Sequence, residues 1–492
     1  MRFSDLAALL DGVAEVACQD GGDPRLRHAC FDSRRVQPGD LYCALPGHRT
    51  DGRAFLADAF RNGAAAVLLH GDAAGYGALP ALRVRDVAHV AAAAGLAAHH
   101  LAGAPSAELW TAAVTGTNGK STVVHLVERA LNAAGVECAG GGTLGLRCGD
   151  EEQAVVNTTP TADLLHDWLA RSREHGAQAA VLEASSHGIV QDRLAGLRFD
   201  AAAWTNLSHD HLDYHQSLDA YAAAKGLLFR RLESGAAGLL PAAQPELREH
   251  CAGGAAELYS WGVDAPLADL RCEVELRPRG LRLRIAGVFD SAEFESPLIG
   301  RHNAENLLVA FGLLRLAGLD ADAAADGLAG VGAAPGRLQR VAPGAPWHLY
   351  VDYAHTPEAL RHVLAALREA HPDARVGAVF GAGGDRDPIK RAPMGAAVAE
   401  GADWCVLTSD NPRGEAPEAI AAQVLAGLEA AGGRAEIELD RRAAIRLAVE
   451  RLRPGDVLLV AGKGHETYQE TAGERRHFDD REELQEAAAC SA

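Results

Sequence analysis

The sequence predicts an α/β protein of three domains, and two patterns carry this prediction. The first is an apolar segment at residues 109–114, followed by a glycine-containing loop and by apolar residues at helical spacing over 123–131. The second is the alternation of apolar segments with amphipathic helices between residues 349 and 460, which is typical of a mostly parallel sheet covered by helices on both faces. A chain of 492 residues is long enough for several domains that each have a core.

The composition is that of a globular protein with an acidic surface. The formal net charge is −19, and nine cysteines are scattered along the chain. The charge argues against a general nucleic-acid-binding surface, and the cysteines predict reduced thiols rather than a disulfide framework or a zinc site. The N-terminus has no long apolar core, and the most apolar window, 87–104, is interrupted by histidines. We therefore expect neither a signal peptide nor a membrane span, and a cytoplasmic location.

The loop at residues 116–122, with the sequence GTNGKST, has the features of a phosphate-binding loop. Glycines let the backbone approach an anion, and the amide groups and dipole of the following helix favour negative charge there. Lys120 adds a charge near the terminal phosphates, and Ser121 offers a hydroxyl to magnesium. Val114 stands where the general motif has its first glycine, and an ordinary glycine turn is the alternative. The position between strand and helix nevertheless favours nucleotide phosphate binding.

Polar residues follow other apolar segments of the central region. The predicted strand 179–183 ends in Glu183, and a carboxylate beside a phosphate loop is where nucleotide hydrolases hold magnesium. Three histidines and two aspartates lie within residues 208–215 and are too costly to bury without partners. From these residues alone, an exposed loop and a metal or phosphate site are equal alternatives. Apolar and polar residues alternate over 272–285 on either side of a turn at 277–280, which predicts a β-hairpin.

We place the domains at residues 1–105, 106–335 and 336–492. The first contains predicted strands at 41–45 and 64–69 with polar loops between them, as in a small α/β domain. In the third, polar clusters follow each of four predicted strands, and the carboxyl ends of parallel strands form the ligand edge of such sheets. We therefore expect a binding face built from residues 352–357, 381–387, 409–413 and 461–466.

Together these motifs resemble those of the Mur ligases, and most closely those of the members that add diaminopimelate. The matching segments occur in order over nearly the whole chain and are 115–122, 157–160, 183–188, 210–215 and the four clusters above. The resemblance implies a small N-terminal domain that binds the UDP-precursor and a central parallel-sheet domain, similar to P-loop ATPases, that binds ATP. It also implies a Rossmann-like C-terminal domain that binds the amino acid.

The resemblance further implies an ATP-dependent ligase of peptidoglycan precursor synthesis. Such an enzyme adds meso-diaminopimelate to UDP-N-acetylmuramoyl-L-alanyl-D-glutamate through an acyl phosphate. The implied ATP-binding residues are Gly116, Thr117, Asn118, Gly119, Lys120, Ser121, Thr122 and Asn303. The implied Mg²⁺ ligands are Ser121, Glu183, His211 and Lys225, and the implied catalytic residues are Lys120, Lys225 and His211.

Lys225 matches the family's carbamoylated lysine. Carbamoylation creates an anionic oxygen donor suited to Mg²⁺, and it requires a partly desolvated site in which the amine is neutral. Without the resemblance, Lys225 reads as a surface residue of a helix.

Two further sets of residues are implied by the resemblance. Those for the UDP-precursor are Phe31, Ser33, His48, Arg49, Thr50, Asn157, Thr158, Thr159, Ser185, Gln191 and Arg193. Those for diaminopimelate are Arg391, Asp410, Asn411, Pro412, Arg413, Gly462 and Glu466. The second stereocentre of this amino acid carries a carboxylate and an ammonium, for which an arginine such as Arg413 and an acid such as Glu466 are suitable partners.

Two other functions stay open at the level of sequence. A sister ligase, adding lysine or extending folylpolyglutamate, would share the phosphate loop, but Arg413 and the segment 157–160 argue against it. A nucleotide-dependent switch or binding module would explain the phosphate loop but not the clusters of the third domain. For the ligase we expect a monomer that binds neither nucleic acid nor membrane.

Overall fold

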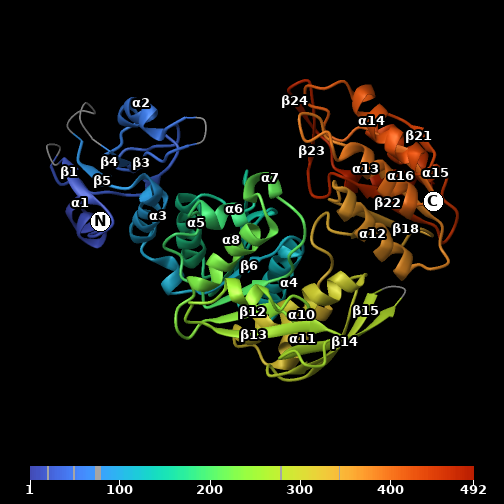
Figure 1. Ribbon diagram of the computed structural model, residues 1–492, viewed down its shortest axis with the longest axis horizontal. Helices are drawn as coiled ribbons and strands as arrows, with labels where there is room; N and C mark the ends of the chain where they lie inside the picture. The colour runs from blue at the N-terminus through green and yellow to red at the C-terminus, as the bar shows by residue number, and fades with distance from the viewer. Residues whose placement is uncertain (19–21, 48–49, 72–78, 278–279, 343, 492) are drawn as a thin grey trace. The chain divides into compact units, whose positions relative to one another are not determined.

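The structure is a computed structural model (Figure 1) that describes residues 1–18, 22–47, 50–71, 79–277, 280–342 and 344–491. The chain forms two compact units. One comprises Met1–Cys272, Ile285–Ser291 and Asn306–Leu328, and the other comprises Glu273–Arg284, Ala292–Glu305 and Ala329–Ala492. Three large sheets of five, eleven and six strands and a two-stranded ribbon make up the β-structure of the described residues.

The N-terminal sheet has the order β1-β5-β4-β3-β2, with β1 antiparallel to β5 and the other neighbours parallel. Helices α1 and α3 cover one face, where Phe3, Leu6 and Val90 are buried, and α2 covers the other through Leu56. The elements are α1 (Phe3–Leu9), β1 (Glu15–Cys18), β2 (Ala29–Cys30), β3 (Leu41–Cys43), η1 (Gly52–Phe55), α2 (Leu56–Arg61), β4 (Ala66–His70), β5 (Ala81–Val84), η2 (Val87–His89), α3 (Val90–Leu101) and η3 (Pro105–Ala107).

The eleven-stranded sheet has the order β16-β15-β14-β13-β12-β11-β6-β10-β7-β8-β9. Its centre is parallel and alanine-rich, so helices pack closely on both faces: α5, α6 and α8 share one core cluster with it, and α4 packs on β6, β7 and β10. Its strands are β6 (Trp110–Thr115), β7 (Cys138–Gly142), β8 (Gly145–Cys148), β9 (Glu151–Gln153), β10 (Ala179–Glu183), β11 (Ala201–Trp204), β12 (Ala237–Pro241), β13 (Glu257–Val263), β14 (Leu270–Arg277), β15 (Gly280–Gly287) and β16 (Ala292–Ser296). The helices of this region are α4 (Lys120–Ala133), α5 (Ala162–Glu174), α6 (Ser186–Val190), α7 (Leu212–His215), α8 (Leu218–Arg230), α9 (Leu247–His250), α10 (Arg301–Leu316) and α11 (Ala321–Ala329).

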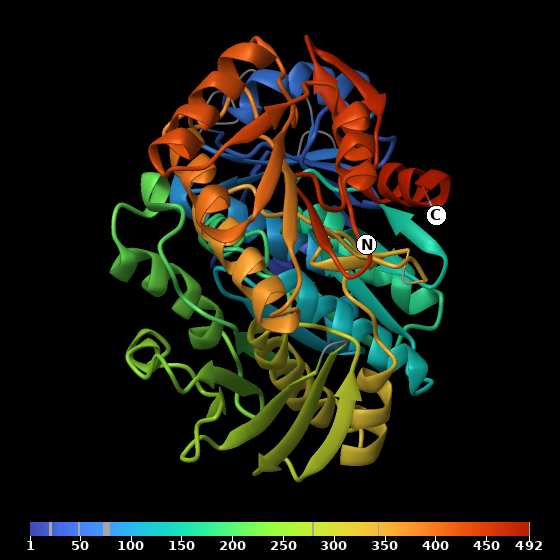
Figure 2. The ribbon, with the colours of Figure 1, turned by 90° about the vertical axis from the view of Figure 1, so that its right-hand side faces the viewer.

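The C-terminal sheet has the order β17-β18-β22-β19-β20-β21 and is parallel except for β17. Side chains alternate along its strands between two cores, one shared with α12, α13 and α14 and the other with α15 and α16, so helices cover both faces (Figure 2). The elements are β17 (Gln339–Val341), β18 (His348–Asp352), α12 (Pro357–Ala370), β19 (Val376–Phe380), α13 (Arg391–Gly401), β20 (Trp404–Leu407), α14 (Pro417–Ala430), β21 (Ala435–Ile437), α15 (Arg441–Glu450), β22 (Val457–Ala461), β23 (Tyr468–Thr471), β24 (Glu474–His477) and α16 (Asp480–Ser491).

The predicted α/β class, the parallel sheets and the strand-loop-helix at the phosphate loop are confirmed. Helix α4 starts at Lys120, three residues earlier than its apolar periodicity indicates, because the last residues of the loop form its first turn. Strands β14 and β15 form the predicted hairpin region, whose turn residues 278–279 lie outside the described part of the chain. The domain boundaries at residues 105 and 335 remain predictions.

Two expectations from composition can be compared with the structure. Eight cysteines of the described residues carry free thiols, and seven of these are buried. No helix among these described residues is both long enough and apolar enough to cross a membrane.

The central core gives a first testable prediction. Leu182 of β10 is 2% exposed and packs over Gly141, where an added Cβ would lie 2.5 Å from its Cδ2. Leu182→Ala removes these contacts and leaves a cavity, so we expect a loss of about 2–5 kcal/mol in the free energy of unfolding, measured by urea titration. Leu267 is 97% exposed, and Leu267→Ala is the matched control, with an expected change within about 0.5 kcal/mol. Equal effects of the two substitutions would contradict the core assignment.

Candidate active site

The loop between β6 and α4 is shaped by two glycines that no other residue can replace without strain. Gly116 has a φ of +146° and Gly119 a φ of +87°. A Cβ on Gly116 would lie 1.9 Å from Oγ1 of Thr205, and one on Gly119 would lie 2.4 Å from Oδ1 of Asn306. The backbone of the loop is therefore in direct contact with two polar side chains, as expected for a backbone cradle that has no room for side chains.

The segment that follows β11 holds the loop in place. Asn206 accepts a hydrogen bond from the Thr117 amide through its carbonyl (2.9 Å) and one from the Asn118 amide through Oδ1 (3.0 Å). Thr205 donates from Oγ1 to the Asn118 carbonyl at 2.5 Å, and the Ser208 amide donates to Oγ1 of Thr117 at 3.0 Å. Because β11 pairs in parallel with β6, this segment emerges beside the loop. The sequence analysis did not assign Thr205, Asn206 or Asn306 a role, although two polar residues directly after a buried strand were a signal.

Lys120 lies in the first turn of α4 and folds back over the loop. Its Nζ donates to the carbonyls of Gly116 and Thr117, each at 2.8 Å. Ser121 and Thr122 are 7% and 8% exposed in the same turn. The predicted ATP-binding residues from Gly116 to Thr122 therefore lie in one loop and the first turn of α4, with the Lys120 ammonium bound to the loop carbonyls, and their role in phosphate binding stays a prediction.

Lys225 reaches the same loop from α8. It is 1% exposed, its Nζ donates to the carbonyl of Gly116 at 2.8 Å, and it lies 4.4 Å from the centroid of the Tyr221 ring. Burial lowers the pKa of Lys225 well below its usual value, and the nearby charge of Lys120 lowers it further. The reading of Lys225 as a surface residue is thus wrong. A lowered pKa increases the fraction of neutral amine, which is the form that reacts with carbon dioxide.

Glu183 ends β10 next to the phosphate loop, because it pairs in register with Val114 of β6. Its side chain is 2% exposed and accepts hydrogen bonds from the Thr143 amide (2.7 Å) and the Thr143 hydroxyl (3.2 Å). The Thr143 hydroxyl in turn contacts the hydroxyl of Thr158 at 3.0 Å. Glu183, a predicted metal ligand, is therefore linked through Thr143 to Thr158, which is predicted to bind the precursor.

Most of the central residues predicted for the precursor come together around this strand end. Thr159 donates from Oγ1 to the Glu183 carbonyl at 2.9 Å, and the same hydroxyl lies 3.0 Å from Oγ of Ser185. Arg193 donates to the Thr159 carbonyl (2.8 Å) and to Oε1 of Gln191 (2.7 Å). Burial lowers the pKa of Arg193 from its usual value. Asn157 lies beside this group in sequence and is exposed.

The histidine-rich segment packs against aromatic rings near Lys225. The His211 ring lies 5.0 Å from that of His187 and 6.1 Å from that of Tyr221. His215 is buried and contacts Oγ of Ser186 at 2.9 Å. Among the described residues, no three His, Cys, Asp or Glu side chains converge in a metal-binding arrangement. His211 thus lies near the lysine, and its role as a metal ligand stays a prediction.

The N-terminal residues predicted for the precursor are only partly described. The Phe31 amide donates to Oδ2 of Asp163 in α5 at 3.1 Å, and the Ser33 carbonyl accepts from Nδ2 of Asn62 at 2.8 Å. Thr50 is exposed, and His48 and Arg49 lie outside the described residues. Asp163 was not singled out from the sequence.

The predicted amino-acid residues cluster at the carboxyl ends of the C-terminal strands. Nδ2 of Asn411 donates to Oε2 of Glu466 at 2.9 Å, although β20 and β22 are not neighbours in the sheet. Arg413 has a φ of +54°, its amide donates to the Glu470 carbonyl at 3.0 Å, and its Nη1 donates to the Gly384 carbonyl at 2.7 Å. The cation and the acid are therefore both held by backbone and side-chain hydrogen bonds.

Two glycines bring the loops of this edge close together. Gly462 has a φ of +119°, and a Cβ there would lie 2.4 Å from Oδ2 of Asp410. A Cβ on Gly384 would lie 1.9 Å from the carbonyl oxygen of Pro412. The predicted residues Asp410, Pro412 and Gly462 thus belong to one tightly packed set of loops.

Three polar residues of this unit are almost completely buried, which the sequence did not indicate. Arg391 is 1% exposed, and its guanidinium pairs with both carboxylate oxygens of Glu415 (2.9 and 2.7 Å). Lys463 is fully buried and donates to Oδ1 of Asn411 (3.1 Å) and Oε2 of Glu466 (3.2 Å). Asn303 is 5% exposed and donates to the Ile299 carbonyl at 2.9 Å, and its role toward adenine stays a prediction.

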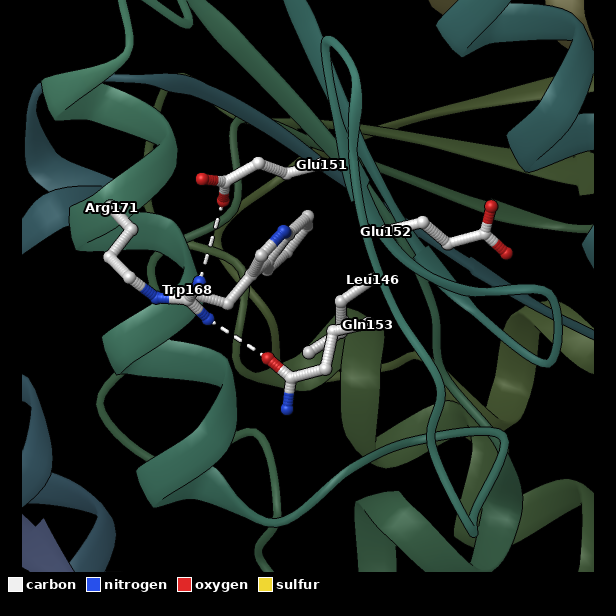
Figure 3. Close-up of a pocket in the computed structure, with 6 residues that line it drawn as sticks. All are labelled: Leu146, Glu151, Glu152, Gln153, Trp168 and Arg171. Atoms are coloured by element: carbon white, nitrogen blue, oxygen red, sulfur yellow. Dashed lines mark hydrogen bonds and ion pairs between the residues drawn. The ribbon is translucent and has the colours of Figure 1, made fainter.

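A hollow of about 270 Å³ lies at β8, β9 and α5 (Figure 3). Arg171 pairs there with Glu151 at 3.5 Å and with Oε1 of Gln153 at 2.9 Å. Its lining contains none of the predicted site residues and comprises Leu146, Glu151, Glu152, Gln153, Trp168 and Arg171.

Comparison with known families identifies the class of protein. The family described as "Mur ligase family, catalytic domain" matches residues 27–102, "Mur ligase middle domain" matches 114–314, and "Mur ligase, glutamate ligase domain" matches 336–464. The chain belongs to the Mur ligase family.

Individual relatives show which members of the family this chain is similar to. The chain is 42% identical over 462 residues to UDP-N-acetylmuramoyl-L-alanyl-D-glutamate–2,6-diaminopimelate ligase of Gloeobacter violaceus, covering 93% of this chain and 92% of that protein. It is also 42% identical over 493 residues to the ligase of the same name from Streptomyces coelicolor, covering 98% and 96%.

Solved structures agree with these relatives. A structure of a ligase of that name matches with a TM-score of 0.68 and 34% identity over 94% of this chain and 95% of that one. The MurF ligase of Thermotoga maritima in complex with ADP shares the fold, with a TM-score of 0.63 and 17% identity over 94% of this chain and 97% of that one.

The phosphate loop gives a prediction with a matched control. Gly119 and Gly135 both have positive φ and lie just before and just after α4, but only Gly119 has a close neighbour, because a Cβ on Gly135 meets nothing within 4 Å. We expect Gly119→Ala to weaken ADP binding by about 100-fold or more, since the loop must move from Asn306, measured by calorimetry. Gly135→Ala carries the same backbone strain and should leave affinity nearly unchanged. Equal affinities of the two variants would contradict the close-approach account.

Lys225 gives a second prediction. Carbamoylation requires the neutral amine, so we expect a carbamate signal in ¹³C NMR after addition of ¹³C-bicarbonate at neutral pH. Because burial lowers the pKa of Lys225, this reaction should persist at pH values where an exposed lysine is protonated and unreactive. Lys225→Arg keeps a cation but cannot form the carbamate, and we expect it to lose the signal and about 100-fold or more of the activity. Full activity of Lys225→Arg would contradict the assignment.

Proposed function

We propose that this protein is an ATP-dependent ligase that adds meso-diaminopimelate to UDP-N-acetylmuramoyl-L-alanyl-D-glutamate, and that it acts as a cytoplasmic monomer. The observation that carries the proposal is the identity of 42% over nearly the full chain to ligases of that name. The phosphate loop, the residues around Glu183 at the end of β10, and the positions of Arg413 and Glu466 in the C-terminal loops support it.

The reaction has two steps. A carboxylate oxygen of the D-glutamate attacks the γ-phosphorus of ATP, an O–P bond forms, and ADP leaves with the electrons of the broken bond. The neutral amine of diaminopimelate then attacks the acyl carbon, a C–N bond forms, and phosphate leaves as the C–O bond breaks. The amine loses a proton to solvent or a base.

The residues of the phosphate loop act by position and charge. The loop amides and Lys120 hold the β- and γ-phosphates in line with the attacking carboxylate and offset the negative charge that both reactants carry. The group around Thr159, Ser185 and Arg193 lies at the neighbouring strand end, where it can orient the sugar and peptide of the precursor. Positioning of this kind supplies most of the rate acceleration in phosphoryl transfer.

The proposed Mg²⁺ ligands Ser121, Glu183 and carbamoylated Lys225 would offer oxygen atoms, the donors that Mg²⁺ prefers. Ser121 in the first turn of α4 and Glu183 at the end of β10 are buried oxygen donors, and burial lowers the pKa of Lys225, which favours the neutral amine that forms an anionic carbamate. Together with His211 these residues would hold Mg²⁺, which supplies charge neutralisation at the phosphates when bound.

Selectivity for diaminopimelate over lysine would arise from Arg413 and Glu466. The distal centre of diaminopimelate carries both a carboxylate and an ammonium, whereas lysine carries only the ammonium there. Arg413 can bind the carboxylate with two parallel hydrogen bonds, and Glu466, fixed by Asn411, can accept from the ammonium. A lysine-adding ligase would leave Arg413 without an anion.

The proposed reaction is tested by phosphate release from ATP with the purified precursor. We expect release that depends on both precursor and amino acid, and a kcat/KM for meso-diaminopimelate at least about 100-fold above that for L-lysine. Preference for lysine would favour the sister ligase. ATP hydrolysis that is independent of precursor and amino acid would favour a nucleotide-driven switch and overturn the proposal.

The role of Arg413 is tested by its replacement with methionine. We expect the KM for meso-diaminopimelate to rise about 10- to 100-fold, because a charged hydrogen bond of ~1.5–3 kcal/mol is lost. The low activity with L-lysine should stay nearly constant. Arg446→Met, at an exposed arginine of α15 outside the predicted binding clusters, is the control and should change neither value. An unchanged KM in Arg413→Met would remove this residue from the site.

A further inference from the structure

The most completely buried ion pair of the C-terminal unit lies beneath the amino-acid residues. Arg441, the first residue of α15, and Asp480, the first residue of α16, are both 0% exposed at their side chains. The guanidinium meets the carboxylate through two parallel hydrogen bonds of 2.7 Å, from Nε and from Nη2. Because the side chain of Arg441 has no exposed surface, it is not placed to touch a substrate.

The remaining donors of Arg441 reach the backbone of two separate loops. Nη2 donates to the carbonyl of Ala461 at 2.9 Å, and Nη1 donates to the carbonyl of Ser409 at 3.3 Å. Ala461 directly precedes Gly462, and Ser409 directly precedes Asp410. One guanidinium therefore holds the starting points of both loops that carry the proposed diaminopimelate residues.

Backbone hydrogen bonds within the sheet do not connect these two loops. Strand β19 lies between β20 and β22 in the strand order, so no backbone ladder joins the two strands that feed these loops. Above the guanidinium, Lys463 bridges Asn411 and Glu466, and Gly462 touches Asp410. These contacts join later residues of the two loops, whereas Arg441 joins the residues that directly precede them.

Stability alone does not account for such a pair. A buried ion pair pays a large desolvation cost, and replacement by apolar residues of similar volume is often neutral or stabilising. We propose that Arg441, held by Asp480, is a positioning residue for the amino-acid site: it fixes the spacing of the 409–413 and 462–466 loops and thereby tunes affinity for the amino acid. This inference rests on the proposed function for the identity of that amino acid.

The test compares two pairs that join the same helices. In the double variant Arg441→Met/Asp480→Leu, we expect a folded protein with the KM for meso-diaminopimelate raised at least about 10-fold, because small displacements of binding groups are costly. The KM values for ATP and for the precursor should stay within about 2-fold. Arg442 and Glu483 also link α15 to α16, Arg442 is half exposed, and within the described part of the chain the two side chains form hydrogen bonds with each other and none with the loops. The control Arg442→Met/Glu483→Leu should leave all three KM values unchanged.

A second variant keeps the inference testable if the double variant does not fold. Arg441→Lys retains the charge beside Asp480 but cannot reach both carbonyls, so we expect a smaller rise in the same KM. An unchanged KM for meso-diaminopimelate in a folded Arg441 variant would overturn the inference. An equal rise in the KM values for all three substrates would also overturn the inference, because it would indicate a general structural role of Arg441.

Hydrogen exchange separates this inference from the proposed function. In the Arg441 variants, amides of residues 409–413 and 462–466 should exchange faster than in wild type, while the Arg442 control should match wild type. If the wild-type protein does not use meso-diaminopimelate, the proposed function fails, and the exchange result still decides whether Arg441 positions the loops. Unchanged exchange in both loops would overturn the inference.

Discussion

The rest of the ATP site depends on how closely the backbone of the phosphate loop approaches its neighbours. Gly116 and Gly119 leave no space for a side chain against Thr205 and Asn306, so only glycine lets the loop approach these residues so closely. In the same loop, the Gly116 carbonyl accepts hydrogen bonds from the amines of both Lys120 and Lys225. One short piece of backbone therefore contacts both Lys120, which is predicted to bind the phosphates, and Lys225, the buried amine that is predicted to be carbamoylated.

The C-terminal site follows a different principle. Its polar residues lie at the ends of parallel strands, where neighbouring loops meet because the strands run in the same direction. The pairing of strands does not set the distance between loops that are one strand apart. Side-chain contacts supply it: Asn411 with Glu466, Lys463 with both, and Arg441 with the backbone below them.

The sequence predicted the fold and much of the site because both have local signals. Alternating apolar and polar segments identified the sheets, and the glycine-lysine-serine turn located the phosphate loop. The residues that sequence reasoning missed act across long sequence distances, as Asn206 does on Asn118 and Arg441 on Ala461. Lys225 shows the same limit: its burial, which lowers the pKa of its amine, includes a contact with Gly116, which lies far from it in the sequence. Such contacts cannot be inferred from a single sequence, because they depend on which strand ends become neighbours in the fold.

The central claim is that the loop holds ATP for transfer of its γ-phosphate to the precursor's glutamate carboxylate. The most direct measurement uses a precursor with ¹⁸O in that carboxylate and analyses phosphate and peptide product by mass spectrometry after one turnover. The account predicts one ¹⁸O atom in the phosphate and diaminopimelate in amide linkage in the product. Unlabelled phosphate together with amide formation would contradict an acyl phosphate, and phosphate release without amide formation would contradict the ligase itself.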